Sequence, residues 1–571
     1  MRRDDRHTDW ILFLIGLPFV VWAALLAAPY CKGGLPELFW NMDSIINHPF
    51  DIQICGDTKS CVLFLLSAYA LAFGVYLSTR KNYRRGEEYG SAKWGDVRAV
   101  NRKYRNRKFA ENKILTNGVR ISLDVRKHFR NLNTLVIGGS GAGKTRYYCK
   151  PNVLNANTSL FVLDPKGEIL RDTGNALKRK GYRIRVLDLI NMDKSHCYNP
   201  FCYLRTDNDV QRLVTNLFKS TTQKGTQSQD PFWDNAASML LLALIFYLWY
   251  EAPEDELFDR LEMKNPEHIA VKYYRSYHSG SAKTLKSIQI TLMARLEKFN
   301  LESLSKLTMT DEMDLAGMGE EKTALYAIIP DNDTSFNFLI SILYTQLFQQ
   351  LFYLADYKYG GSLPVQVHLL MDEFANVSLP DDFDKILAVM RARGMFVSII
   401  LQNLSQLKAL FEKQWESIVG NCDEFLYLGG NEKETHKYVS ELLGKENLDT
   451  NTYGKSTGHS GNYSTNYQLT GRELLTPDEV RMLDNRYAIL FIRGERPVMD
   501  LKFNLMKHPN IGDSADGKGG VYPHGTVTKA VATISLQEID GEEAAEISTN
   551  EKTEEYVLLT EEEIEQLTNA D

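Results

Sequence analysis

The most constraining feature of this 571-residue sequence is a glycine-rich segment that directly follows a short apolar run. Residues 132–137, LNTLVI, have the composition of a buried strand, and residues 138–145, GGSGAGKT, complete a G-x4-G-K-T motif. In such a motif the backbone N–H groups close around phosphate oxygens, and the following helix turns its N-terminus toward the anion. The sequence therefore predicts a P-loop within an α/β fold that has a mostly parallel sheet.

Two side chains of the motif have predicted roles of their own. Lys144 is expected to reach the β- and γ-phosphates of ATP, and the hydroxyl of Thr145 is expected to ligate Mg²⁺. The main chain of the whole motif is expected to bind the phosphates, so the candidate binding residues are Gly138, Gly139, Ser140, Gly141, Ala142, Gly143, Lys144 and Thr145.

A P-loop needs an acidic partner at the end of a neighbouring strand, and three apolar runs offer one. Residues 161–164 and 185–188 each end in a single aspartate, whereas residues 367–371 are followed by Asp372 and Glu373. Hydrolysis needs one group to hold Mg²⁺ through water and another to polarise the attacking water. Only Asp372 with Glu373 supplies both groups, so we choose this pair; the alternative is a pair of carboxylates that caps a helix.

Gln402 and two arginines are further candidates. The apolar run 396–401 ends at Gln402, whose amide would face the γ-phosphate and report its presence, although an amide at a strand end often only caps it. Arg391 and Arg393 precede this run. In a ring of subunits such an arginine can cross the subunit boundary and stabilise transition-state charge. The alternative for both arginines is a solvated helix end, where cations are favoured.

Two uncharged apolar segments near the N-terminus, residues 10–28 and 61–78, predict membrane-spanning helices, because about 20 apolar residues cross a bilayer. Arginines precede the first segment and a basic cluster follows the second, whereas the loop between them, residues 29–60, is acidic. Positive flanks stay inside, so we expect a multi-pass protein of the cytoplasmic membrane, with both termini in the cytoplasm and the loop outside. A cleaved signal peptide is the alternative for the first segment.

The net charge of −7 hides two oppositely charged segments. Between Arg80 and Lys108 there are 11 Lys and Arg residues against three Asp and Glu residues. From Leu536 to Asp571 there are 13 acidic residues and one basic residue. The basic segment is typical of sequence beside a membrane span that touches anionic lipid, with nucleic acid as the alternative contact. The acidic segment predicts a largely disordered tail, whose role stays open.

These features divide the chain into five predicted parts. The apolar segment 232–250 is expected to be a buried helix of an inserted bundle, with a third membrane span as the alternative, and the polar segment 449–469 is expected to be a loop. The parts are a transmembrane anchor (1–80), a basic segment leading into the body (81–130), a nucleotide-binding domain in two pieces (131–205 and 315–508), an inserted all-α domain (206–314) and the acidic tail (509–571).

Several short segments, taken in order, resemble the type IV coupling proteins of the TraG family, within the wider FtsK/HerA class of RecA-like motors. A P-loop alone is common, whereas the ordered set between about residues 89 and 497 is specific. Besides the P-loop and Gln402, the set comprises GSAKW at 90–94, LDPKGE at 163–168, DPFW at 230–233, IPD at 329–331, MDEF at 371–374 and RELL at 472–475.

The resemblance implies a two-span anchor, a RecA-like ATPase domain that uses ATP and Mg²⁺, an inserted all-α domain and a homo-hexamer. It further implies that the protein receives a relaxase–single-stranded DNA complex and passes it to a type IV secretion channel in conjugation. Two alternatives stay open: a nucleotide-controlled receptor or scaffold that does no motor work, and a DNA pump of the FtsK kind. Protein substrates without DNA also fit the resemblance.

Overall fold

The computed structural model describes most of the chain as two compact units, residues 1–88 and residues 89–571. The basic segment that we predicted to lead into the body is therefore divided, and from Tyr89 onward it belongs to the second unit. The part of the predicted tail from residue 526 onward lies outside the described residues. The described residues are 4–30, 37, 40–79, 89–221, 231–251, 265, 267–377, 379, 382–455 and 463–525.

The first unit pairs two long helices, α1 (Asp4–Ala27) and α4 (Thr58–Thr79), with the short α3 (Met42–Asn47) between them in sequence. The ring of Tyr69 stacks on that of Phe13 at 5.0 Å, and its hydroxyl donates to the Phe13 carbonyl. Gly16 makes room for this tyrosine, because a Cβ there would lie 2.2 Å from the Tyr69 hydroxyl oxygen. Both helices are long and apolar enough to cross a membrane and expose leucines along their outer faces.

The body is organised around one sheet, whose described residues form nine strands in the order β13-β12-β9-β3-β8-β7-β4-β6-β5. The seven strands from β9 to β5 are parallel, and β12 runs antiparallel to both of its neighbours, β9 and β13. The predicted fold class is therefore confirmed. In chain order the strands are β3 (Thr134–Ile137), β4 (Ser159–Pro165), β5 (Arg183–Asp188), β6 (Thr323–Ile329), β7 (Val367–Met371), β8 (Met395–Leu401), β9 (Glu424–Tyr427), β12 (Tyr487–Ile492) and β13 (Val498–Leu501).

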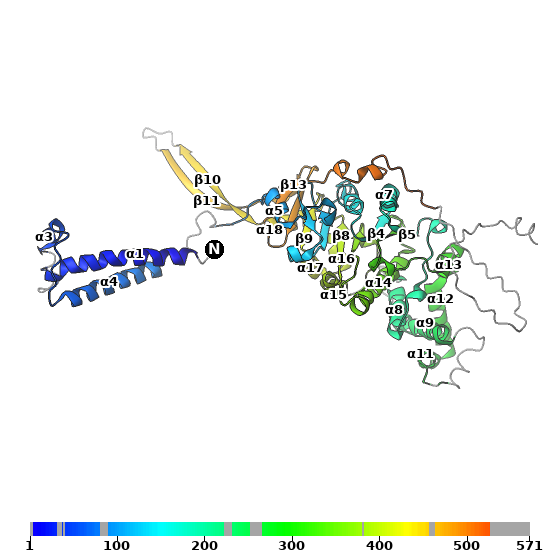
Figure 1. Ribbon diagram of the computed structural model, residues 1–571. Helices are drawn as coiled ribbons and strands as arrows, with labels where there is room; N and C mark the ends of the chain where they lie inside the picture. Colours follow the sequence, from blue (N-terminus) through cyan, green and yellow to red (C-terminus); the bar gives the residue numbers. More distant parts are fainter. Residues whose placement is uncertain are drawn as a thin grey trace, which may run out of the picture. The chain divides into compact units, whose positions relative to one another are not determined.

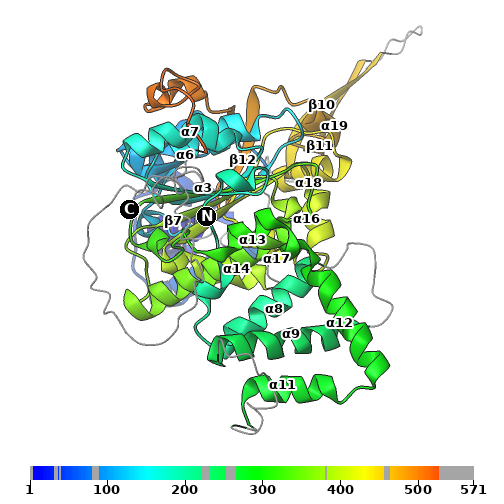
Figure 2. The same cartoon turned by 90° about the vertical axis from the view of Figure 1, so that its right-hand side faces the viewer.

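Helices cover both faces of this sheet (Figure 2). The parallel strands are apolar throughout because both of their faces are buried. Alternate side chains enter two separate cores: on β3, Leu135 and Ile137 enter one core and Val136 enters the other. The Val136 face is covered by α6 (Lys150–Leu154) and α7 (Glu168–Arg179), and the opposite face by α14 (Asn337–Tyr353), α15 (Phe383–Met390) and α16 (Leu404–Leu410).

A bundle of helices is inserted between β5 and β6. Its central helix α9 (Pro231–Glu251) is apolar and long enough to cross a membrane, yet it packs against other helices of the bundle. Ala237, Ala243 and Phe246 on α9 are fully buried, as expected for a helix inside a bundle. The other helices are α8 (Asp207–Thr221), α11 (Ile269–His278), α12 (Ala282–Leu296) and α13 (Glu302–Met309).

A long hairpin replaces the loop that we predicted at residues 449–469. Its strands, β10 (Lys445–Lys455) and β11 (Tyr463–Glu473), are paired along their whole length and extend away from the rest of the body (Figure 1). The prediction was wrong because it required an apolar face. Threonine and tyrosine favour extended backbone without one, and Tyr453 pairs with Thr465 and Tyr467 with Asn451.

The predicted start of the tail at residue 509 is also wrong, because the chain continues as an ordered strap up to Gly525. This strap, residues 504–525, lies against α6 and α7. Asn175 donates to three carbonyls between Gly519 and Val521, and Arg179 pairs with Asp513 at 2.8 Å. Polar contacts of this kind leave no apolar run in the sequence, so the sequence pattern does not mark the strap.

His508 ties the strap to the body and should make folding sensitive to acid. Burial lowers its pKa to about 4, and its Nε2 lies 3.0 Å from Oδ1 of Asn155. A depressed histidine pKa contributes stability above the unfolded pKa of about 6.5 that is lost as the pH falls through 4. We expect the free energy of unfolding to drop by about 2 kcal/mol from about pH 7 to about pH 5 through this residue.

Chemical unfolding of wild type and His508→Gln at both pH values checks this prediction. Glutamine keeps a group that can bond Asn155 and does not titrate, so the variant should lose that part of the acid dependence. His278→Gln, at an exposed histidine on α11, is the matched control and should keep it. Equal acid dependence in wild type and His508→Gln would contradict the prediction.

Candidate nucleotide site

The predicted site residues meet at one edge of the sheet because their strands are parallel neighbours. β8 lies between β3 and β7, and all three end at the same edge. The P-loop follows β3, Gln402 follows β8, and Asp372 and Glu373 follow β7. Strand order alone therefore brings three separate segments of the chain to one place.

The P-loop is held to the sheet by its first two glycines. The N–H of Gly138 donates to the carbonyl of Leu401 at 3.0 Å, and that of Gly139 donates to the carbonyl of Gly429 at 2.8 Å. Gly141 and Gly143 have φ angles of +76° and +80°, which side chains with a Cβ rarely adopt. The loop is therefore anchored on two neighbouring strand ends and turns back over them.

Lys144 and Thr145 lie at the start of the helix that follows the loop. The Lys144 ammonium donates to the carbonyls of Gly138 and Gly139 at 2.9 and 3.4 Å, so it points back across the loop that would hold phosphate. The Thr145 hydroxyl donates to Oδ2 of Asp372 at 2.9 Å. This contact joins the P-loop to the acid chosen from the sequence.

Asp372 has the surroundings of a metal-holding carboxylate. Its side chain is buried, and burial raises its pKa, while the Thr145 hydroxyl and the Lys144 charge act in the opposite direction. A hydroxyl oxygen beside a carboxylate oxygen is the donor set that Mg²⁺ prefers, and the ion usually keeps several waters. The residues present therefore fit Mg²⁺.

Glu373 follows with a strained backbone. Its φ of 51° is in the left-handed region, which costs a residue with a Cβ on the order of 1 kcal/mol. The conformation places its carboxylate near Gln402, whose Nε2 lies 3.5 Å from Oε1 of Glu373. The backbone N–H of Gln402 donates to Oε1 of Gln406 at 2.9 Å. The structure thus brings both predicted residues to the same edge as the P-loop.

An open pocket of about 470 Å³ lies over the P-loop and shows residues that our sequence reasoning missed. Its far wall comes from the segment after β9 and from the turn after α19 (Pro477–Arg481). No motif marks these positions, which are scattered over the segment after β9, the end of α19 and the turn that follows it. The pocket is lined by residues 139–142, Gln402, Asn403, residues 429–432, Arg481, Leu483 and Asn485.

Lys502 is a second contact that the sequence did not reveal. It follows β13 and donates to the carbonyl of Ala142 at 2.9 Å and to Oδ1 of Asn485 at 2.6 Å. Burial lowers its pKa to about 8. Lys502 therefore holds Ala142 of the P-loop and Asn485 of the pocket wall at the same time.

Asp164 and Asp188, the two other aspartates that follow apolar runs, lie at very different distances from the P-loop. β4 pairs with β7, so Asp164 lies beside Asp372, where burial raises its pKa to about 7. One of its oxygens accepts from the N–H of Leu170 at 2.8 Å, and the other is buried with no hydrogen-bond partner among the described residues. Asp188 ends β5 at the far edge of the sheet, where it pairs with His524 at 2.9 Å.

Arg391 and Arg393 do not join this site within one chain. They precede β8 and so lie at the opposite edge of the sheet from Gln402, about 20 Å away along the seven residues of that strand. Arg393 is engaged by Asp356 at 2.7 Å and lies over the ring of Phe352.

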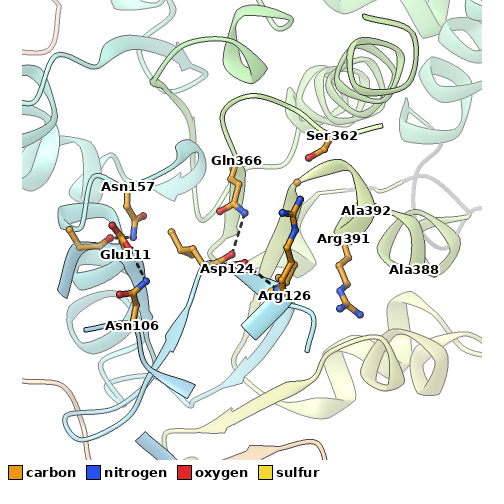
Figure 3. A pocket seen from close by; sticks show the side chains of 14 residues that line it. Asn106, Glu111, Asp124, Arg126, Asn157, Ser362, Gln366, Ala388, Arg391 and Ala392 are labelled. Atoms are coloured by element: carbon orange, nitrogen blue, oxygen red, sulfur yellow. Dashed lines mark hydrogen bonds between the residues drawn. The ribbon is translucent and has the colours of Figure 1, made fainter. Parts of the chain in front are cut away.

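Arg391 instead lines a second cavity, of about 750 Å³, at that opposite edge (Figure 3). Arg126 enters the same cavity from a different element, and Asp124 and Gln366 are also in its wall (Figure 3). Both arginines are exposed, and a partner subunit could reach Arg391 from solvent.

Known proteins resemble this chain over most of its length. The family model described as "Type IV secretory system Conjugative DNA transfer" matches residues 91–258 and 250–505. VirD4 of Rhizobium radiobacter is 23% identical over 391 residues, which cover 64% of this chain and 56% of VirD4. The conjugal transfer protein TraG of Escherichia coli is 22% identical over 508 residues, which cover 77% of this chain and 78% of TraG.

A solved structure shares the fold. The plasmid coupling protein TrwB, in complex with ADP and Mg²⁺, aligns with a TM-score of 0.52 and 18% identity, covering 72% of this chain and 93% of TrwB. The aligned segment spans a little over half of the first VirD4 relative, so the whole activity of these proteins is not carried over by similarity alone. The match of the family model covers most of the chain and confirms the predicted resemblance. The chain therefore belongs to the type IV secretory system conjugative DNA transfer family, whose coupling proteins include TraG and VirD4.

Proposed function

We propose that this chain is a membrane-anchored ATPase that couples ATP hydrolysis to the transfer of DNA through a type IV secretion channel. The observation that carries the proposal is the 2.9 Å hydrogen bond between Thr145 and Asp372, with Glu373 and Gln402 at the same sheet edge. The family supplies the process, conjugative DNA transfer, and the site supplies the chemistry.

The residues divide the work of hydrolysis among themselves. The P-loop N–H groups and Lys144 would bind the phosphates of ATP, and Thr145 and Asp372 would hold Mg²⁺, the latter through water. The ion would supply charge that offsets the negative charge of the transferring phosphoryl group. Glu373 would orient a water and accept its proton as the water oxygen bonds to the γ-phosphorus and the bond to the β-phosphate oxygen breaks. Gln402 would face the same γ-phosphate.

Nucleotide and metal are supported by the structural relatives. TrwB has been solved with the ATP analogue ADPNP and with ADP and Mg²⁺, and its fold is that of this body. The Thr145 hydroxyl and the Asp372 carboxylate are oxygen donors of the kind that Mg²⁺ takes beside nucleotide phosphates. ATP is therefore the proposed substrate, and Mg²⁺ the proposed metal.

The remaining parts of the proposal concern location and partners. The apolar helices Trp10–Tyr30 and Thr58–Ser78 would anchor the chain in the cytoplasmic membrane, with both termini in the cytoplasm. The partners would be a relaxase–single-stranded DNA complex and the secretion channel, and the working form would be a homo-hexamer. Residues 1–80 as the anchor, 206–314 as the inserted all-α domain and the flanking nucleotide-binding pieces complete this division of labour.

Two substitutions separate a motor from a nucleotide-controlled receptor. Lys144→Ala should abolish nucleotide binding and turnover, because the phosphates lose their cation. Glu373→Gln should keep nucleotide binding but lower ATP turnover by about 10²–10⁴-fold, because proton acceptance is lost. ATP turnover with and without single-stranded DNA, and conjugation frequency in cells, measure these effects. Glu441→Gln, on the exposed surface of α18 (Lys433–Leu443), is the matched control and should change neither.

A Glu373→Gln protein that binds ATP without hydrolysing it, and still transfers DNA at the normal frequency, would rule out motor work. That outcome would favour the receptor, which needs nucleotide but not its hydrolysis. Normal turnover by Lys144→Ala would remove the site assignment altogether.

We further propose that Arg391 completes the site of a neighbouring subunit. Mixing inactive Arg391→Ala protein with inactive Lys144→Ala protein should then restore part of the ATPase activity. An intact P-loop in one subunit would meet an intact arginine from the next. An arginine that acts within its own chain, or only stabilises the fold, gives no restoration, because every subunit in the mixture keeps one defect. Turnover of mixed and unmixed samples at equal total concentration is the measurement.

A further inference from the structure

Three buried polar side chains form a chain of hydrogen bonds below the nucleotide site. The hydroxyl oxygen of Ser398 lies 2.7 Å from that of Tyr148 and 2.8 Å from Nε2 of His368. All three side chains are buried, with exposed fractions of 0% for Tyr148 and Ser398 and 3% for His368. They come from three elements: the helical turn after the P-loop, β8 and β7.

Each of these elements also carries one group of the nucleotide site. Tyr148 is one helical turn beyond Thr145. Ser398 and His368 each lie four residues before the group that follows their strand, Gln402 and Asp372 respectively. The hydrogen-bond chain therefore connects the three elements that carry Thr145, Gln402 and Asp372, the groups that would have to act together in hydrolysis.

The surroundings make these hydrogen bonds costly to lose. Apolar residues such as Val136 pack around them, and the polar groups nearby, Thr134 and Lys113, are themselves buried, so a freed hydroxyl would meet no water. Burial holds the pKa of His368 well below its ordinary value, so the ring is neutral. Tyrosine can then donate to serine and serine to the ring nitrogen, which satisfies the two hydroxyls and Nε2 of the ring.

Main-chain hydrogen bonds tie the P-loop itself to β8, through Gly138 and Leu401, but none among the described residues ties the helical turn after it to the sheet. β7 and β8 are locked to each other by their parallel ladder, whereas the helical turn after the P-loop packs on the sheet through side chains. The Tyr148 hydroxyl makes a polar contact from that turn to β8, because it lies directly against the Ser398 hydroxyl. Its loss would let the P-loop helix shift relative to Gln402 and Asp372 while the fold persists.

We infer that Tyr148, Ser398 and His368 are positioning residues, which hold Thr145, Gln402 and Asp372 in the arrangement that hydrolysis needs. The inference rests on the proposed ATPase function of this sheet edge. It predicts that breaking this chain lowers turnover more than removing one buried hydrogen bond elsewhere in the same sheet lowers it.

The chain offers a matched control for Tyr148→Phe. Tyr326 on β6 is equally buried, and its hydroxyl lies 3.1 Å from that of Thr173 on α7, in a pair that touches no predicted site residue. Tyr148→Phe and Tyr326→Phe each remove one buried hydroxyl, so the two should lower the melting temperature similarly. Only Tyr148→Phe should lower kcat, by about 10-fold, because small displacements of reacting groups are costly. The Kd for ATP should stay within about 3-fold, since the phosphate-binding backbone is intact.

Equal kcat in the two variants, whether unchanged or lowered alike, would overturn the inference, because turnover would then only follow stability. Should Tyr148→Phe fail to fold, His368→Gln and His368→Leu decide instead. Glutamine retains a group that can bond Ser398 and leucine does not, so kcat should be higher in His368→Gln at similar melting temperature. Equal kcat in this second pair would overturn the inference too.

Wild type and Lys144→Ala are measured beside these variants to keep the two proposals apart. Wild-type turnover that Lys144→Ala abolishes, with Tyr148→Phe no worse than Tyr326→Phe, would overturn the positioning role and leave the ATPase standing. Wild-type protein that binds ATP but does not hydrolyse it would overturn the ATPase proposal and the positioning role with it.

Discussion

The rest of the site depends on the strand order that brings the Thr145 hydroxyl within hydrogen-bond distance of Asp372. β8 separates the P-loop strand from the acidic strand, so these two segments do not pair with each other through their main chains. One hydroxyl and one carboxylate bridge the gap at 2.9 Å. A contact of this size is worth only about 1–3 kcal/mol, so it reflects rather than creates the arrangement. The sheet and its packed helices have to hold both ends in place.

The sequence was sufficient where a polar residue directly follows an apolar run. Asp372, Glu373 and Gln402 could be placed because parallel buried strands end at one edge, and the edge is where ligands bind. Arg481 and Lys502 could not be placed in the same way. Arg481 ends a short helix and Lys502 follows the antiparallel strand β13, so their positions depend on the folded chain rather than on periodicity. The sequence also indicates Arg391 and Arg393 as candidates. Only the direction of β8 shows that they lie at the opposite end of the strand from Gln402.

The two errors in the fold have one physical cause, since neither segment carries a continuous apolar run, although the strap buries Leu505 against Leu154 and Ala176. The hairpin β10–β11 is stabilised by its backbone ladder and by residues that favour extended structure. The strap is held by side chains such as Asn175 and Arg179, which donate to its carbonyls and carboxylates. A search for apolar runs detects neither kind of contact. The same search succeeded for α9, whose burial is almost entirely apolar.

Strand β8 runs between the two ends of the sheet that the proposed ring would use, the end at the nucleotide site and the end that carries Arg391. Arg391 lies just before β8 and Gln402 just after it, with Ser398 in between and bonded to both neighbouring elements. If Arg391 completes a neighbour's site, β8 touches two nucleotides, one at each end. Buried strands do not deform gradually, so a displacement at one end is carried to the other. Such a strand would give a ring a direct route for coordinating hydrolysis between adjacent subunits.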